Sequence, residues 1–211
     1  MKNLLKRRKL NRKLKTMQKQ ARDVFIPVLR PKTSKFLKKI VRKNKFDNIL
    51  EIGTAIGYSG SLMLVNSKNQ TARLTTIDID EERLVKAKEN FKNFGVNDRV
   101  EILVGDAYEK LLELNDKKIK FDLVLLDGPK GQYFKYYPII KELLNIDGVL
   151  FVDDTLYMGL IDKDGIVKHK HRTIVNSIRN LLNEISNDKN FECKQYKIED
   201  GFVIAKKIKE N

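Results

Sequence analysis

Short apolar segments alternate with helix-length segments through most of this 211-residue sequence. The apolar segments, rich in Val, Ile and Leu, are Asn48–Ile52, Arg73–Asp78, Arg99–Val104, Phe121–Asp127 and Gly148–Asp153. The segments between them predict helices over Tyr58–Asn66, Glu81–Phe94, Tyr108–Leu114 and Tyr133–Leu144. Repeated strand–helix units favour a parallel sheet with helices on both faces, so the pattern predicts an α/β, doubly wound, Rossmann-like fold.

The C-terminal part departs from this alternation. A helix is expected over Arg172–Ser186, followed by two apolar strands, Phe191–Lys197 and Phe202–Lys206. The turn-forming residues Glu199-Asp200-Gly201 separate the two strands. This pattern predicts an antiparallel hairpin at the edge of a mostly parallel sheet.

The positive charge is concentrated at the N-terminus. Residues 1–45 hold eighteen Lys or Arg and one acid, Asp23, a local balance of +17, whereas residues 46–211 balance at −2. We therefore expect a basic N-terminal helical segment, residues 1–45, and a second domain over residues 46–211. A second helix of this segment is expected to begin near Ser34, after Pro27 and Pro31. A helix through the first segment would dock on the protein through a stripe of residues spaced three and four apart. The stripe comprises Leu10, Leu14, Met17, Ala21, Val24 and Val28.

Three interpretations of the basic helix remain: a polyanion-binding arm, a membrane-surface helix, or a solvated charged face. Its apolar stripe lacks Trp and Phe and is needed for docking, which disfavours the membrane. Acids balance the lysines everywhere except here, which favours the polyanion-binding arm.

The sequence predicts a cytoplasmic protein without a transmembrane helix. Its longest apolar runs are four residues long, whereas a membrane span needs roughly 20. The single Cys193 cannot form an internal disulfide, and the N-terminus has no continuous apolar region of the kind that directs secretion. The oligomeric state, a homodimer included, is left open.

The ends of the first three predicted strands carry residues suited to binding a nucleoside. Gly53 and Gly57 would let the backbone approach a ligand, although the loop matches neither the dinucleotide fingerprint nor a phosphate loop. Asp78 ends the second strand, where a carboxylate can accept hydrogen bonds from a ribose. Asp106 and Ala107 follow the third strand, at a place where a base could lie. Taken singly, the glycines could form a structural turn and the acids could be helix N-caps.

The next two strands end in acids. Asp127 follows the fourth strand, and Asp153 and Asp154 end the fifth. Three neighbouring carboxylates would repel one another, and a hard divalent cation, Mg²⁺ above all, would relieve the repulsion. Lys130 could reach the same place and act on a substrate hydroxyl. The alternative is that the acids cap helices or turns and that Lys130 is a surface lysine.

Three motifs together carry a family resemblance. They are Glu-Ile-Gly-Thr-Ala-Ile-Gly-Tyr-Ser from Glu51, Asp-x-x-Lys-Gly-Gln-Tyr from Asp127, and Asp-Asp from Asp153. Roughly residues 23–206 resemble the metal-dependent O-methyltransferases that use S-adenosylmethionine, which include catechol and caffeoyl-coenzyme A methyltransferases. The resemblance implies a methyltransferase domain over residues 46–211. In that family the third metal position is usually Asn, and here it is Asp154.

The resemblance also implies residue roles. It implies that Asp127, Asp153 and Asp154 bind the metal, and that Lys130 acts as the base in a catalytic pair with Asp127. The cofactor contacts that it implies are Leu29, Glu51, Gly53, Ser59, Asp78, Asp106, Ala107 and Asp127, with Leu29 the weaker assignment.

The bacterial branch similar to tRNA 5-hydroxyuridine methyltransferase resembles this chain in Lys130-Gly131-Gln132-Tyr133 and in the residues after Asp154. Its acceptor would place a hydroxyl beside a carbonyl, so that two adjacent oxygens could chelate a metal as a catechol does. Residues 1–45 and Lys168–Arg172 would contact tRNA phosphates. Two alternatives remain: methylation of a catechol-like small molecule, and an RNA-binding module without catalysis.

Overall fold

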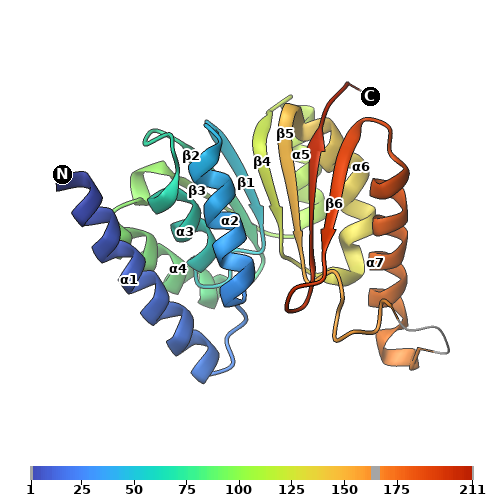
Figure 1. The fold of residues 1–211 in the computed structure, drawn as a ribbon, viewed down its shortest axis with the longest axis horizontal. Coiled ribbons are helices and arrows are strands. Elements are labelled where there is room, and N and C mark those ends of the chain that lie inside the picture. Colours follow the sequence, from blue (N-terminus) through green and yellow to red (C-terminus); the bar gives the residue numbers. More distant parts are fainter. Residues whose placement is uncertain (1, 163–166, 211) are drawn as a thin grey trace. The chain divides into compact units, whose positions relative to one another are not determined.

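The computed structural model describes residues 2–162 and 167–210, which form two compact units that meet between Gly105 and Asp106 in the chain. Figure 1 shows both units, with most of their helices and strands labelled. The boundary predicted between residues 45 and 46 falls inside the first unit and stays a prediction.

The first unit contains three parallel strands in the order β3-β2-β1 (Figure 1). Its elements are α1 (Lys2–Asp23), α2 (Pro31–Lys43), β1 (Asn48–Ile52), α3 (Tyr58–Asn66), β2 (Arg73–Asp78), α4 (Glu81–Phe94), the 3₁₀ turn η1 (Asn97–Arg99) and β3 (Val100–Val104). Ile52 pairs with Ile77, and Asp78 pairs with Val104, so the three strands end at one edge. Helices α1 and α2 both pack against α3.

The second unit contains four strands in the order β4-β5-β7-β6 (Figure 1). Its elements are α5 (Ala107–Asp116), β4 (Phe121–Leu126), η2 (Lys130–Gln132), α6 (Tyr133–Leu143), β5 (Leu144–Asp153), α7 (His169–Asn187), β6 (Phe191–Tyr196) and β7 (Phe202–Lys207). Strands β4 and β5 are parallel, whereas β7 runs antiparallel to both β5 and β6. The predicted C-terminal hairpin is therefore confirmed.

Several predicted boundaries are wrong: α7, for example, begins at His169 and not at Arg172, and α5 ends at Asp116 and not at Leu114. Helix α2 begins at Pro31 and not near Ser34, since a proline suits the first helical position, where no backbone N–H is needed. Strand β5 begins at Leu144 and not at Gly148, because Leu144 already pairs with Phe121 across a register irregularity.

The docking stripe of α1 is confirmed in part. Leu14 and Ala21 are buried, and Leu10 and Met17 are half-buried. Val24, in contrast, is 64% exposed. Helix α1 ends at Asp23, so Val24 lies outside the helix and does not follow its buried face. No helix among residues 2–162 and 167–210 is long and apolar enough to cross a membrane.

Gly57, in the loop after β1, has a backbone conformation and close neighbours that favour glycine. Its φ is +76°, and a Cβ there would lie 3.0 Å from the Phe91 ring. Gly57→Ala should lower the free energy of unfolding by about 1–3 kcal/mol, because both the backbone and the packing are strained. Gly95→Ala is the control, since Gly95 has φ +66° with no atom near its missing Cβ. In urea unfolding, a smaller loss at Gly57 than at Gly95 would contradict this account.

Candidate active site

The loop between β1 and α3 lies at the carboxyl edge of the first unit's strands. The amide of Gly53 donates a hydrogen bond to the Ile77 carbonyl oxygen at 2.9 Å, and that of Gly57 donates to Thr54 at 2.8 Å. Helix α3 begins directly after Gly57, which places the buried Ser59 in its first turn. The predicted glycine turn therefore leads into a helix N-terminus, a place suited to polar ligand groups.

Asp78 links the end of β2 to this loop. Its Oδ2 accepts a hydrogen bond from the Ala55 amide at 2.8 Å, and its Oδ1 accepts one from the Asp80 amide at 3.0 Å. The side chain remains partly exposed at the strand end. Each oxygen retains acceptor capacity beyond these bonds, as a ribose-binding carboxylate requires.

Glu51 and Leu29 lie deeper than the other predicted cofactor contacts. Glu51 is fully buried, and its Oε2 accepts a hydrogen bond from Thr76 at 2.7 Å. The Thr76 hydroxyl also lies 2.6 Å from that of Thr54, which ties β1, β2 and the loop together. Leu29 is buried, and its carbonyl oxygen accepts a hydrogen bond from Gln18 at 2.7 Å. Both residues support the structure here, and their contact with a cofactor stays a prediction.

Asp106 is the N-cap of α5. Its Oδ1 accepts hydrogen bonds from the amides of Tyr108 at 2.8 Å and Glu109 at 3.3 Å. The N-cap interpretation considered for this acid is therefore confirmed. Ala107 is the first residue of α5. Burial, with a smaller contribution from Asp106, raises the pKa of Tyr136 to about 12.

A compact acidic cluster forms in the second unit from Asp127, Asp153 and Asp154. Asp127 directly follows β4, and Asp153 ends β5, so the parallel pairing of the two strands places both acids at one edge. Lys130 lies among them, with Nζ 3.2 Å from Asp154 Oδ2 and 3.8 Å from Asp127 Oδ1. The distances bring Lys130 close to Asp154 and Asp127 as predicted, and Asp153 is coupled to Lys130 electrostatically. The roles assigned to these residues stay predictions.

Burial and neighbouring charges shift the pKa values of the side chains in this cluster. Burial raises the pKa of Asp127 to about 6, with Asp154 raising it further and Lys130 opposing. Burial and the charge of Asp127 raise the pKa of Asp153 well above its usual range. Burial alone would lower the pKa of Lys130, but the surrounding carboxylates outweigh burial and raise it. Lys130 is thus held in its protonated form, and a role as the base, which needs the neutral amine, stays a prediction.

Tyr133 is a member of this cluster that the residue-by-residue reasoning did not single out. It begins α6 and is fully buried, and its hydroxyl has no hydrogen-bond partner among the described residues. Lys130 Nζ lies 5.9 Å from the centre of its ring. Burial, followed by the charges of the three acids, raises its pKa well above the usual value. The sequence feature that could have identified Tyr133 is its position three residues after Lys130.

The donor set of the cluster has the chemistry of a hard-cation site, because it consists of carboxylate oxygens that repel one another. Within residues 2–162 and 167–210, no group of three or more His, Cys, Asp or Glu side chains is gathered closely enough to hold a metal ion as the side chains stand. The ammonium of Lys130 occupies part of the space between the acids.

The second basic cluster, Lys168–Arg172, opens α7. Lys168 is the N-cap residue, and the helix begins at His169. His171 Nδ1 lies 3.1 Å from the Tyr157 hydroxyl, whereas Lys168, Lys170 and Arg172 are exposed. The exposed cations are available to an anionic ligand, and their contact with RNA stays a prediction.

Comparison with known proteins places these observations in a family. A family profile described as O-methyltransferase matches residues 6–208. The chain is 27% identical to a caffeoyl-CoA O-methyltransferase from Populus kitakamiensis over 82% of its own length and 75% of that protein's. A provisionally named caffeoyl-CoA O-methyltransferase from Staphylococcus aureus superposes with a TM-score of 0.83 at 27% identity, covering 92% of this chain and 91% of the other.

A third relative carries a bound cofactor product. The O-methyltransferase from Bacillus cereus, solved in complex with SAH, superposes with a TM-score of 0.81 at 24% identity, over 92% of this chain and 90% of that one. The fold is the α/β Rossmann-like methyltransferase fold, with seven mostly parallel strands and antiparallel C-terminal strands. This chain belongs to the O-methyltransferase family. It is an S-adenosylmethionine-dependent O-methyltransferase that is similar in sequence to caffeoyl-CoA and catechol O-methyltransferases.

Asp78 should contribute to cofactor affinity. Asp78→Ala is expected to weaken S-adenosylmethionine binding by about 1–3 kcal/mol, because ribose hydroxyls would lose their charged acceptor. Asp80→Ala is the matched control, since Asp80 caps α4 and is no predicted cofactor contact. Isothermal titration calorimetry that finds the same affinity for Asp78→Ala and wild type would remove Asp78 from the cofactor site.

Proposed function

We propose that this methyltransferase depends on a divalent cation and methylates 5-hydroxyuridine in tRNA. The acidic cluster supports the metal dependence. Burial and mutual repulsion already raise the pKa of Asp127 and Asp153, so a bound cation would favour their ionised forms. Lys130 alone could balance only one of the three carboxylates once all three are ionised.

Asp127, Asp153 and Asp154 would hold the cation. When bound, it would supply a positive charge that orients two adjacent acceptor oxygens and favours the ionised hydroxyl. Lys130 would contribute a positively charged donor beside the acceptor oxygens, and the buried Tyr133 hydroxyl would offer a neutral donor with no competing partner among the described residues. Asp127 directly follows β4 and Asp153 ends β5, so the pairing of these two strands fixes where the two acids lie.

The proposed cofactor contacts of each unit follow the ends of its own strands. In the first unit, the Gly53–Gly57 loop, Ser59 and Asp78 would receive the amino acid and ribose parts of S-adenosylmethionine. In the second unit, Asp106 and Ala107 would lie beside the base, and Asp127 would approach the methyl-bearing end. These roles rest on the strand-end positions and on the resemblance of the motifs.

The basic helix α1 is the single observation that carries the choice of an RNA acceptor. Its exposed side chains include Lys6, Arg8, Lys9, Arg12 and Lys13, and Asp23 at its last position is its one acid. Phosphates dominate nucleic-acid affinity, whereas a small neutral acceptor needs no extended positive field.

A catechol-like small molecule is the second candidate acceptor. The observation that favours it is the sequence similarity to the Populus relative, a caffeoyl-CoA O-methyltransferase. The two candidates share the requirement for two adjacent oxygens, so the same acidic cluster could serve either one. Methylation assays with free catechols and with tRNA containing 5-hydroxyuridine, run side by side, separate them.

Metal dependence is tested by chelation. EDTA should abolish methyl transfer and added Mg²⁺ should restore it, because the acids would lose the charge that holds the acceptor oxygens. Asp127→Ala and Asp153→Ala should mimic chelation, whereas Asp116→Ala, an exposed acid at the end of α5, should behave as wild type. Full activity of the chelated enzyme would show that the acidic cluster does not use a metal.

The RNA acceptor is tested by the salt dependence of binding. Replacing Lys9, Arg12, Lys13 and Arg22 with Gln should weaken tRNA binding and leave cofactor affinity unchanged. Each lost phosphate contact should reduce the slope of log affinity against log salt by roughly 0.7–0.9.

A control variant removes the same number of exposed positive charges elsewhere. It replaces Lys86, Lys88, Lys92 and Lys117 with Gln, all outside α1. If the α1 variant binds and methylates tRNA with wild-type affinity and slope, the arm is a solvated helix and the small-molecule acceptor is preferred.

A further inference from the structure

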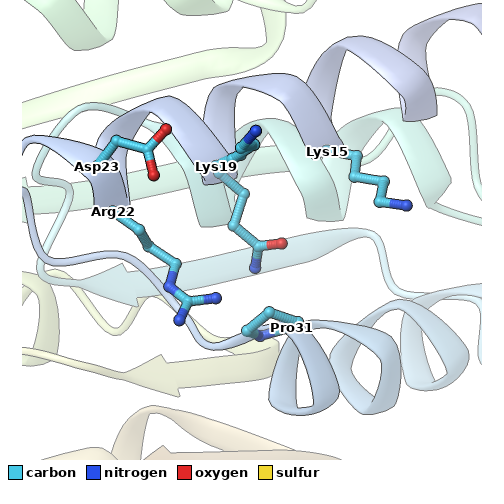
Figure 2. Close-up of a pocket in the computed structure, with 6 residues that line it drawn as sticks. Lys15, Lys19, Arg22, Asp23 and Pro31 are labelled. Atoms are coloured by element: carbon cyan, nitrogen blue, oxygen red, sulfur yellow. The ribbon is translucent and has the colours of Figure 1, made fainter.

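A pocket of about 440 Å³ lies between α1 and the start of α2. It is lined by Lys15, Gln18, Lys19, Arg22, Asp23 and Pro31. Figure 2 shows that the labelled cations project from α1, with Arg22 reaching toward Pro31 at the start of α2. We call it the α1–α2 pocket.

The helical repeat explains how α1 supplies one wall. Lys15, Lys19 and Arg22 are spaced four and three residues apart, so they follow one face of the helix. The pattern that buries Leu14 and Ala21 on the docking side of α1 therefore also aligns these cations along the pocket.

Gln18 holds the two walls together. Its side chain is 7% exposed, and its Nε2 donates hydrogen bonds to the Leu29 carbonyl oxygen at 2.7 Å and to Ser34 Oγ at 2.9 Å. Ser34 Oγ also accepts a hydrogen bond from the Tyr58 hydroxyl at 3.3 Å. Helices α1, α2 and α3 are thus joined by a buried polar network that includes Gln18 of the pocket lining.

The pocket has an excess of positive charge. Among the described residues, Lys15, Lys19 and Arg22 form no ion pair, and Asp23 is the one acid in the lining. The N-cap residue of α2, Arg30, makes no side-chain capping hydrogen bond, and the dipole of the helix adds partial positive charge beside Pro31. Three cations and a helix N-terminus against one carboxylate favour a compact anion with several oxygens.

We propose that the α1–α2 pocket binds a phosphate group of a nucleic-acid strand. The exposed cations continue along α1 beyond the pocket, and a helix of 22 residues is about 33 Å long, enough to face several phosphates. An isolated phosphate would need only the pocket. The choice of a nucleic acid rests on the proposed RNA acceptor, whereas the phosphate site does not.

The test compares two variants that remove the same charge from the same helix. The pocket variant carries Lys15→Gln, Lys19→Gln and Arg22→Gln, and the control variant carries Lys9→Gln, Arg12→Gln and Lys13→Gln, outside the lining. The pocket variant should bind tRNA about tenfold or more weakly than wild type, and the control variant should lose less. Asp23→Asn should bind tRNA more tightly, because it removes the one repulsive charge.

A second measurement addresses the phosphate directly. Inorganic phosphate should shift the NMR signal of the Arg22 Nε–H group in wild type and in the control variant, and should compete with tRNA. Circular dichroism and cofactor affinity would show that each variant is folded.

Several results would overturn the proposal. Equal losses of tRNA affinity in the two variants would mean that only total charge matters. An Arg22 signal that responds to neither phosphate nor tRNA would exclude a phosphate site. A pocket that binds phosphate without competition by tRNA would belong to a small phosphate-bearing ligand.

If tRNA binds through the pocket but is not methylated, the proposed acceptor fails while the phosphate site stands.

Discussion

Parallel strand pairing is the constraint on which the functional positions depend. In the first unit the pairing continues just beyond the strands, where the Gly53 amide bonds to Ile77 and the Gly105 amide bonds to Asp78. Each strand therefore delivers its next residues to one edge, and the connecting helices begin there. In the second unit, the pairing of β4 with β5 brings Asp127 to the same edge as Asp153. Within each unit, loops that are far apart in the sequence thus place their polar groups at the same edge of the strands.

The strands were predictable because their signal is local. Runs of branched apolar residues bounded by polar ones define β1 and β2 to the residue. The predicted element boundaries were wrong where pairing with a residue distant in the sequence determines where a strand begins. Leu144 extends β5 because it pairs with Phe121, more than twenty residues earlier, and no local pattern reveals that pairing. Val24 fits the apolar stripe by spacing, but the helix ends before it, so it is exposed.

The acids of the candidate site were predictable from their positions after strands, but their partners were not. The capping of α5 by Asp106 and the bracing of the glycine loop by Asp78 depend on backbone amides that any residue supplies. Gln18 occupies a helix position between basic residues and carries no pattern that would mark it as buried, although it joins three helices. Polar networks of this kind depend on three-dimensional neighbours, which a single sequence does not specify.

Asp154 shows how backbone geometry and charge combine at the one position that departs from the family pattern. Its φ is +59°, in the left-handed region, where Asn and Asp are the side chains that the backbone tolerates best after glycine. The turn after β5 therefore accepts Asp in place of the Asn usual in the family with little change of backbone. The difference is electrostatic, because Asp adds a negative charge beside Asp127 and Asp153. Lys130 Nζ lies closer to Asp154 than to Asp127, so the added charge is also the one that the lysine neutralises most directly.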